Sequence, residues 1–155
     1  MSDDESDDEE DRPLLSYKFW FKKKSDEEVL PLITTRACKQ KDDDGKFPLH
    51  YAAECSDSYA VIEKMIKKYE KATKKKAEFG RLPLHFAADN NRSATVLGLL
   101  ILHNPDAIKK KDIFGDVPKE QDDANDATKE MLELAETEEG LEVIGGKWMC
   151  VCQRL

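Results

Sequence analysis

Two similar ten-residue segments occur in this chain, first Gly45-Lys46-Phe47-Pro48-Leu49-His50-Tyr51-Ala52-Ala53-Glu54 and, 35 residues later, Gly80-Arg81-Leu82-Pro83-Leu84-His85-Phe86-Ala87-Ala88-Asp89. A fainter copy, Gly115-Asp116-Val117-Pro118, follows at the same offset, and projection in the other direction reaches Pro13-Leu14-Leu15. Self-similarity at a fixed period predicts a repeat architecture. Four units in this 35-residue register therefore account for most of the 155-residue chain.

Each unit has the sequence signals of two helices joined by a polar break. Pro48, Pro83 and Pro118 predict helix starts, because proline has no N–H to lose at the first helical position. The breaks at 55–58, 90–93 and 125–128 contain Ser, Asn, Asp and Thr, which cap helices. The second helices then have apolar side chains at helical spacing, namely Val61, Ile62, Met65, Ile66; Val96, Leu97, Leu100, Ile101; and Met131, Leu132, Ala135.

A two-helix unit cannot bury its apolar face alone, so neighbouring units must stack, with polar units at the ends. The fourth unit has Lys119-Glu120-Gln121-Asp122-Asp123 where the central units have Leu-His-aromatic-Ala-Ala, which suits a solvent-facing cap. The sequence therefore predicts an all-α repeat solenoid over residues 12–140. Its expected units are 12–44, 45–79, 80–114 and 115–140, flanked by an acidic segment, 1–11, and a C-terminal segment, 141–155.

The Pro-Leu-His-x-Ala-Ala core, placed after a turn glycine and before a second amphipathic helix, resembles the ankyrin repeat, which has a period of about 33 residues. The resemblance is strongest over residues 42–111. It implies a helix-turn-helix solenoid that binds a partner protein on its concave surface. The family's usual Thr before the proline is replaced by Phe47, Leu82 and Val117, so the hydroxyl that often bonds the motif histidine is missing.

Three sequence features bear on the cellular location of the protein. The longest apolar stretch, residues 96–102, contains Gly98 and is far shorter than the roughly 18 residues needed to cross a bilayer. The acidic start excludes a secretory signal, so we expect an intracellular protein, cytoplasmic or nuclear. The four cysteines contain no Cys-x-x-Cys pair and fit free thiols in a reducing compartment.

The net charge of −8 is unevenly distributed along the chain. Residues 1–11 contain eight acids and no base, residues 12–111 contain 13 acids and 21 bases, and residues 112–142 contain 12 acids and two bases. Lys64, Lys67, Lys68 and Lys71, followed by the triplets 74–76 and 109–111, predict a basic outer ridge. This ridge leaves nucleic-acid or anionic-lipid binding as the alternative function, although interleaved aromatic residues are missing.

No residue pattern indicates catalysis, a metal site or a cofactor. His50 and His85 recur within the repeated motif, which favours a structural role that ties backbone groups between units. The sequence contains no phosphate-binding glycine loop, no Gly-x-Ser-x-Gly and no His-Glu-x-x-His. We therefore expect a monomeric binding protein rather than an enzyme.

The resemblance places turn tips and first helices on the concave surface. Aromatic and Arg side chains dominate binding energies at such surfaces. Tyr51 and Phe86 can either face this groove or pack between repeats, and the sequence does not separate the two alternatives. The candidate partner-binding residues are Lys46, Tyr51, Glu54, Arg81, Phe86, Asp89 and Asn90.

Both terminal segments contain candidate modification sites. Ser2 and Ser6 each precede an acid by three residues, a pattern similar to the sites of acid-directed protein kinases. We interpret the acidic segment either as a solubilising tail or as one that folds back on the basic middle. Cys152 lies four residues from the end, the position of a prenylated cysteine, but Gln153 and Arg154 depart from the aliphatic pattern.

Overall fold

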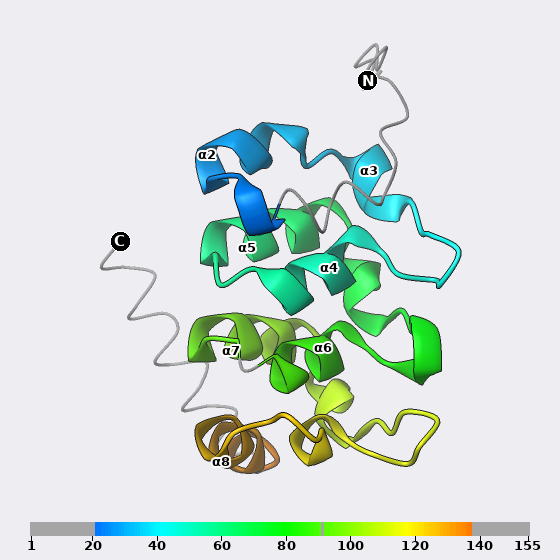
Figure 1. Cartoon of the computed structure of the whole chain (residues 1–155), viewed down its shortest axis with the longest axis vertical. Helices are drawn as coiled ribbons and strands as arrows, with labels where there is room; N and C mark the ends of the chain where they lie inside the picture. Colours follow the sequence, from blue (N-terminus) through cyan, green and yellow to red (C-terminus); the bar gives the residue numbers. More distant parts are fainter. Residues whose placement is uncertain (1–20, 91, 138–155) are drawn as a thin grey trace.

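The computed structural model describes residues 21–90 and 92–137, and this part of the chain forms stacked helical layers without a strand (Figure 1). The first layer contains α2 (Asp26–Val29), η1 (Leu30–Leu32) and α3 (Thr35–Lys39), where η denotes a 3-10 helix. The second contains α4 (Pro48–Cys55), α5 (Tyr59–Lys68) and η2 (Glu70–Lys74). The third contains η3 (Glu78–Gly80), α6 (Pro83–Asp89), α7 (Ala94–His103) and η4 (Pro105–Lys109); the fourth contains η5 (Pro118–Glu120) and α8 (Asp126–Ala135). The predicted all-α repeat solenoid is confirmed.

The helix starts follow from proline and from polar caps. Pro48 and Pro83 are the first residues of α4 and α6. The side chains of Ser58, Ser93 and Asn125 accept hydrogen bonds from backbone N–H groups three residues later, at 3.3, 3.4 and 2.9 Å. These contacts satisfy N–H groups that have no partner within the first turn of a helix. The predicted polar breaks therefore cap α5, α7 and α8.

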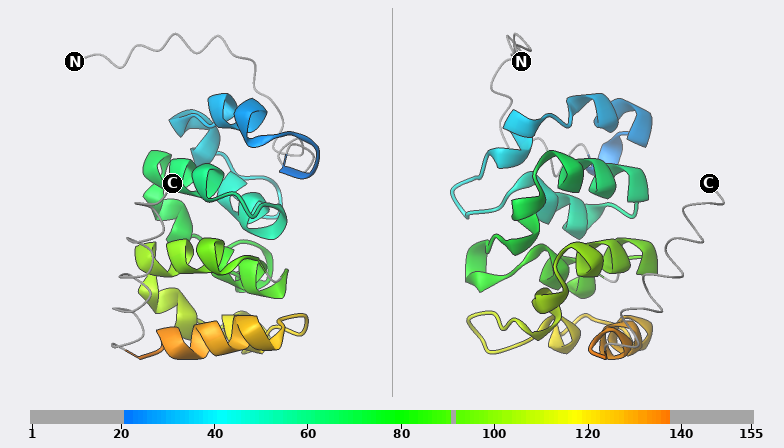
Figure 2. Two further views of the ribbon diagram at one scale, coloured as in Figure 1. Left: turned by 90° about the vertical axis from the view of Figure 1, so that its left-hand side faces the viewer. Right: turned by 180° about the vertical axis from the view of Figure 1, so that it is seen from behind.

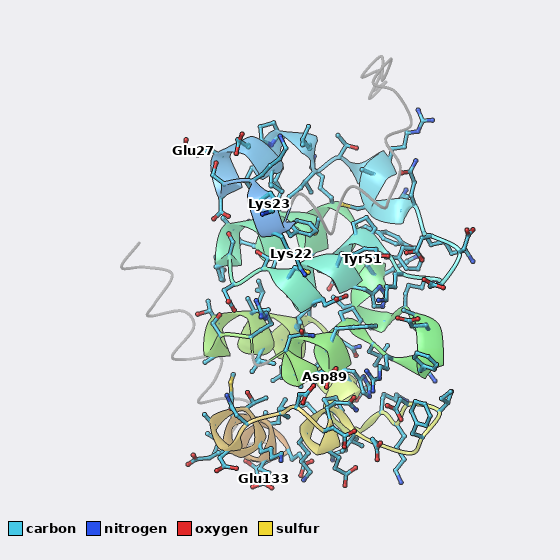
Figure 3. All side chains as sticks on the ribbon, viewed as in Figure 1. Lys22, Lys23, Glu27, Tyr51, Asp89 and Glu133 are labelled. Carbon is cyan, nitrogen blue, oxygen red and sulfur yellow. The ribbon has the colours of Figure 1, made fainter. Side chains whose placement is uncertain are left out.

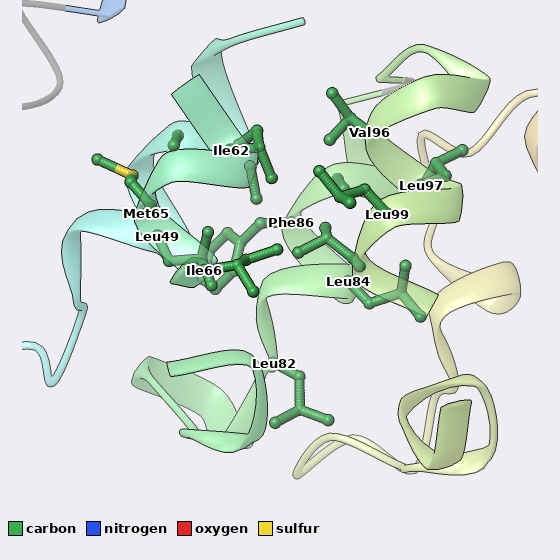
Figure 4. Packing of buried hydrophobic residues seen from close by; sticks show 14 of the residues in the cluster. Leu49, Ile62, Met65, Ile66, Leu82, Leu84, Phe86, Val96, Leu97 and Leu99 are labelled. Carbon is green, nitrogen blue, oxygen red and sulfur yellow. The ribbon is translucent and has the colours of Figure 1, made fainter. Parts of the chain in front are cut away.

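The helices form two rows, with α4 above α6 in one and α5 above α7 in the other (Figures 1 and 2). The buried core lies between the rows and contains every apolar residue predicted for the second helices, with Met131 partly buried at its edge. Figure 4 shows side chains of adjacent layers in contact, among them Ile66, Phe86 and Leu99. At about 25 cal/mol per Å² of apolar surface removed from water, this packing is the main stabilising term.

Three hairpins project from the layers, and each turns at a glycine. Gly45, Gly80 and Gly115 have φ values of 73°, 69° and 92°, which glycine adopts at little steric cost. In each hairpin the glycine N–H donates to a carbonyl three residues earlier, at 3.0 to 3.2 Å. The hairpins continue the helical stack on one side of the molecule (Figure 1).

The fourth layer departs from the prediction in its first helix. Pro118 begins only the 3-10 turn η5, and the backbone becomes extended at Gln121. Gln121 is 2% exposed, and its amide donates to Asp112 Oδ2 and to the Val117 carbonyl, both at 3.4 Å. The prediction that this residue faces solvent is therefore wrong, because its side chain joins the hairpin to the cap. Asp122 and Asp123 are exposed as expected.

Within the described residues, no helix has the length and apolar character needed to span a membrane. The longest α-helices, α5, α7 and α8, have ten residues each.

Candidate functional site

The two motif histidines are part of the scaffold. His50 Nδ1 accepts the Phe47 N–H at 3.0 Å, and its Nε2 donates to the Lys75 carbonyl at 2.9 Å. His85 Nδ1 accepts the Leu82 N–H at 3.1 Å in the same way. Burial lowers the pKa of His50 to about 4 and also lowers that of His85, so both rings are neutral near pH 7. The imidazoles therefore bind the first turn of α4 and α6 directly, without the hydroxyl that the family usually supplies.

Lys46 is a buried cation that connects the first helices. Its side chain is 11% exposed, and Nζ lies 2.8 Å from Glu78 Oε1 and 3.5 Å from Glu54 Oε2. The same Nζ lies 5.3 Å from the ring centre of Tyr51 and 4.9 Å from that of Phe86. Four predicted candidates, Lys46, Tyr51, Glu54 and Phe86, thus meet in one cluster across α4 and α6.

Both aromatic candidates lie inside this cluster. Tyr51 is 6% exposed and Phe86 is 5% exposed. The Tyr51 hydroxyl donates to the Asp42 carboxylate, and the Phe86 ring lies edge-on to His50 with 5.6 Å between the ring centres. Burial, together with the Asp42 hydrogen bond, raises the pKa of Tyr51. The rings therefore pack between repeats and position the charged groups around them.

The other candidates, Arg81, Asp89 and Asn90, form a second, more accessible group at the two ends of α6. The Arg81 guanidinium lies 3.5 Å from Asp89 Oδ2 and 3.4 Å from Asp112 Oδ2, with the Arg81 side chain 23% exposed and that of Asp89 25% exposed. The Asn90 amide donates to the Phe86 carbonyl at 2.9 Å and so caps the end of α6. Figure 3 shows Tyr51 and Asp89 on α4 and α6, along the same side of the molecule.

Exposed apolar side chains lie at the tips of the second and third hairpins, and the sequence analysis missed them. Phe79, Ile113 and Phe114 are 49%, 68% and 64% exposed. The two phenyl rings are 5.7 Å apart between centres, and the Ile113 N–H donates to the Phe79 carbonyl at 2.9 Å. Phe79 and Phe114 occupy the same repeat position, directly before the turn glycine, and this register was the signal that could have identified them. We call these three residues the tip patch.

Phe79 holds its position at a conformational cost. Its φ is 56° and its ψ is 19°, which makes it the one non-glycine residue with positive φ in the described part of the chain. An L-residue in this left-handed region costs roughly 1–2 kcal/mol. Outliers of this kind cluster at functional sites.

The structure does not describe the predicted modification sites, and the described residues offer little other reactive chemistry. Ser2, Ser6 and Cys152 lie outside the described residues. Burial raises the pKa of the Cys38 thiol to about 12, so this cysteine is a poor nucleophile near neutral pH. Among the described side chains, no three His, Cys, Asp or Glu residues are grouped as a metal site would require.

Comparison with known families agrees with the repeat geometry. The family model for ankyrin repeats matches residues 21–112 and contains three copies. A comparison with curated proteins finds no match at a significant level. The matched region covers more than half of the chain and the first three layers of the stack. The chain therefore belongs to the ankyrin-repeat family.

Proposed function

We propose that this chain is a non-enzymatic adaptor that binds a partner protein on the concave surface made by its hairpins, α4 and α6. Ankyrin repeats are in general protein-binding modules, and the tip patch is the observation that carries the assignment to this surface. Three large apolar side chains, all between 49% and 68% exposed, gather on two adjacent hairpins. Contiguous exposed apolar side chains mark sites of protein contact.

The tip patch is preorganised for binding. The Phe79 backbone has a positive φ, which costs free energy for this residue. Asn or Gly would remove that cost, yet the position holds an exposed phenyl ring. The Phe79 and Phe114 rings contact each other in a tilted arrangement, and the backbone hydrogen bond from Ile113 to Phe79 joins the two tips. Preorganisation of this kind reduces the ordering cost of binding.

Charges beside the tip patch favour a partner with a mixed surface. Asp43 and Asp44 are exposed at the tip of the first hairpin, where the other two hairpins carry the apolar residues. A partner that fits this edge has a basic group opposite these carboxylates and an apolar group opposite Phe79 and Phe114. Arg81, just before α6, and Asp89, the last residue of α6, are partly exposed and offer hydrogen bonds deeper on the same surface.

The remaining sequence candidates act in this proposal as supports for that surface. Tyr51 and Phe86 enclose Lys46, and Lys46 in turn holds Glu54 and Glu78. Asn90 fixes the end of α6. The proposed domain extends over residues 12–140, with η5 and α8 as its polar cap, and acts as a monomer in an intracellular compartment.

A capture experiment with matched variants tests the proposal. The immobilised chain is incubated with lysate of its source cells at physiological salt, and bound proteins are quantified by mass spectrometry. The variant Phe79→Ser/Phe114→Ser is compared with Leu134→Ser, which alters a side chain 50% exposed on α8. We expect specific proteins to be retained by the parent and by the α8 variant and lost by the tip variant. Equal retention by all three would reject the hairpin tips as the binding site.

A further inference from the structure

A second group of side chains, in the segments that precede the hairpins, has an excess of positive charge. Residues 35–41, 70–76 and 105–111 contain ten basic and two acidic side chains. All the lysines among them are exposed, and none forms an ion pair with another described residue. We call these lysines the lysine ladder, and they are Lys39, Lys41, Lys71, Lys74, Lys75, Lys76, Lys109, Lys110 and Lys111.

The repeat register aligns the ladder along the stack. Lys39, Lys74 and Lys109 are each 35 residues apart and end α3, η2 and η4 respectively. Figures 1 and 2 show these three elements one below another. The Asn104 amide, at the start of η4, donates to the Thr73 carbonyl of η2 at 2.8 Å and fixes the two levels together. The ladder therefore runs along the stack, from one layer to the next.

The sequence-predicted basic ridge is only partly available on α5 itself. Lys64 is half-buried and donates to the Leu30 carbonyl at 2.7 Å, and Lys67 lies 3.2 Å from Glu63. On α5 Lys68 is exposed and forms no ion pair with another described residue, but most of the exposed lysines lie on the short elements α3, η2 and η4 and on the loops that follow them. Like charges at this density repel one another, so an anionic chain that lies along the ladder is stabilised by several ion pairs together.

We propose that the lysine ladder is the docking site of the chain's own acidic segment, residues 3–11. This inference goes beyond the proposed adaptor function and concerns residues other than the tip patch. The segment contains eight acids and no base, which matches the net excess of eight bases in the three ladder-bearing segments. Charge complementarity of this kind steers the two segments together and disfavours basic occupants.

Chain length permits this docking. Residues 12–20 connect the acidic segment to Phe21, which packs against the core in the first layer, and they can span about 30 Å when extended. The nine residues of the acidic segment span a similar length. Three layers of helices at a spacing of about 10 Å place the first and last levels of the ladder about 20 Å apart. One extended segment can therefore contact all three levels.

Covalent attachment favours this occupant over external polyanions. A short linker gives the tethered segment an effective concentration in the millimolar range, so weak individual ion pairs suffice. A nucleic acid or an anionic membrane must displace the segment and approach a chain whose net charge is −8. The docked segment therefore shields the ladder from such ligands.

Zero-length crosslinking of the full chain tests the contact. A carbodiimide joins carboxylates to nearby amines, and mass spectrometry identifies the joined residues. We expect residues 3–11 to link to Lys74–Lys76 and Lys109–Lys111 at least about fivefold more than to Lys67, an exposed control lysine, and to lose this preference at high salt. An even distribution over all exposed lysines, or links found only between isotopically different chains in a mixed sample, would overturn the proposal.

Competition with an external polyanion gives an independent test. In one variant the eight acids of residues 3–11 become Asn or Gln; in a second, Lys74–Lys76 and Lys109–Lys111 become Gln. The probe is a fluorescent single-stranded oligonucleotide, with phosphatidylserine vesicles as a second probe, and circular dichroism checks the fold. We expect the neutral-tail variant to bind at least about tenfold more tightly than the parent, and this gain to vanish when the ladder is also neutralised. Equal binding by the parent and the neutral-tail variant would refute docking.

Discussion

Replacement of Lys46 by Met is expected to lower the free energy of unfolding by about 3 kcal/mol. Removal of one partner from a fully buried ion pair costs roughly 3–5 kcal/mol. Lys46 and Glu54 have side chains only 11% and 17% exposed, whereas Glu78 is 32% exposed and keeps part of its hydration. The ion-pair loss is therefore about 2 kcal/mol, and the cation–π contacts with Tyr51 and Phe86 add roughly 0.5 kcal/mol each. Met retains the aliphatic contacts with both rings.

Urea unfolding followed by far-ultraviolet circular dichroism measures this cost. The control is Lys67→Met, because Lys67 is 70% exposed and its pair with Glu63 is worth no more than about 0.5 kcal/mol. The double variant Lys46→Met/Glu54→Gln is expected to recover about 1 kcal/mol, since the carboxylate left without its cation is then neutral. A cost below about 1 kcal/mol for Lys46→Met, with no coupling to Glu54, would refute the structural role of this cation.

Three further predictions follow from the buried histidine, the strained hairpin and the core. His50 has a pKa of about 4 in the folded chain against about 6.5 when unfolded, so its contribution to stability is complete above pH 6.5 and is lost as the pH falls. Between pH 7 and pH 5 the free energy of unfolding of the parent, measured by urea titration, should fall by about 2 kcal/mol more than that of His50→Gln. Identical decreases in the two proteins would contradict this prediction. Phe79→Asn should raise the free energy of unfolding by about 0.5 kcal/mol in thermal melts, because Asn tolerates a φ of 56° better than Phe. The same variant should capture less partner. A lower free energy of unfolding would show that the Phe79 backbone is not strained. Leu100→Ala should cost about 2–5 kcal/mol because Leu100 is 2% exposed, whereas Leu102→Ala, at a residue 40% exposed, should cost under about 1 kcal/mol in the same assay.

The fold could be predicted because its signals are local and repeat in register. Proline at helix starts, polar caps and apolar spacing each act within a few residues, and the 35-residue offset relates one unit to the next. The short helices η2 and η4 were missed, since a single 3-10 turn has too few residues to show a helical period. Pro105, at the start of η4, was the local signal that could have indicated one of them.

The candidate surface was predicted less completely, because burial depends on neighbouring layers. The register places Tyr51 and Phe86 on the adjacent first helices α4 and α6, with Lys46 just before α4. These side chains are buried because the hairpins that contain Asp42 and Glu78 contact them. No local sequence pattern indicates such contacts. The tip patch was missed because hairpin tips are usually polar, so Phe79 and Phe114 were not considered as exposed residues.

Amide hydrogen exchange of the chain with and without its captured partner tests the central claim most directly. Bound partner is expected to protect the hairpin residues 42–46, 77–81 and 112–116 and the amides of α6, while the amides of α5 and α8 exchange as in the free chain. Such a footprint would place the partner on the hairpins and first helices. Protection confined to α5, α8 or the lysine ladder, with hairpin exchange unchanged, would contradict the proposed binding surface.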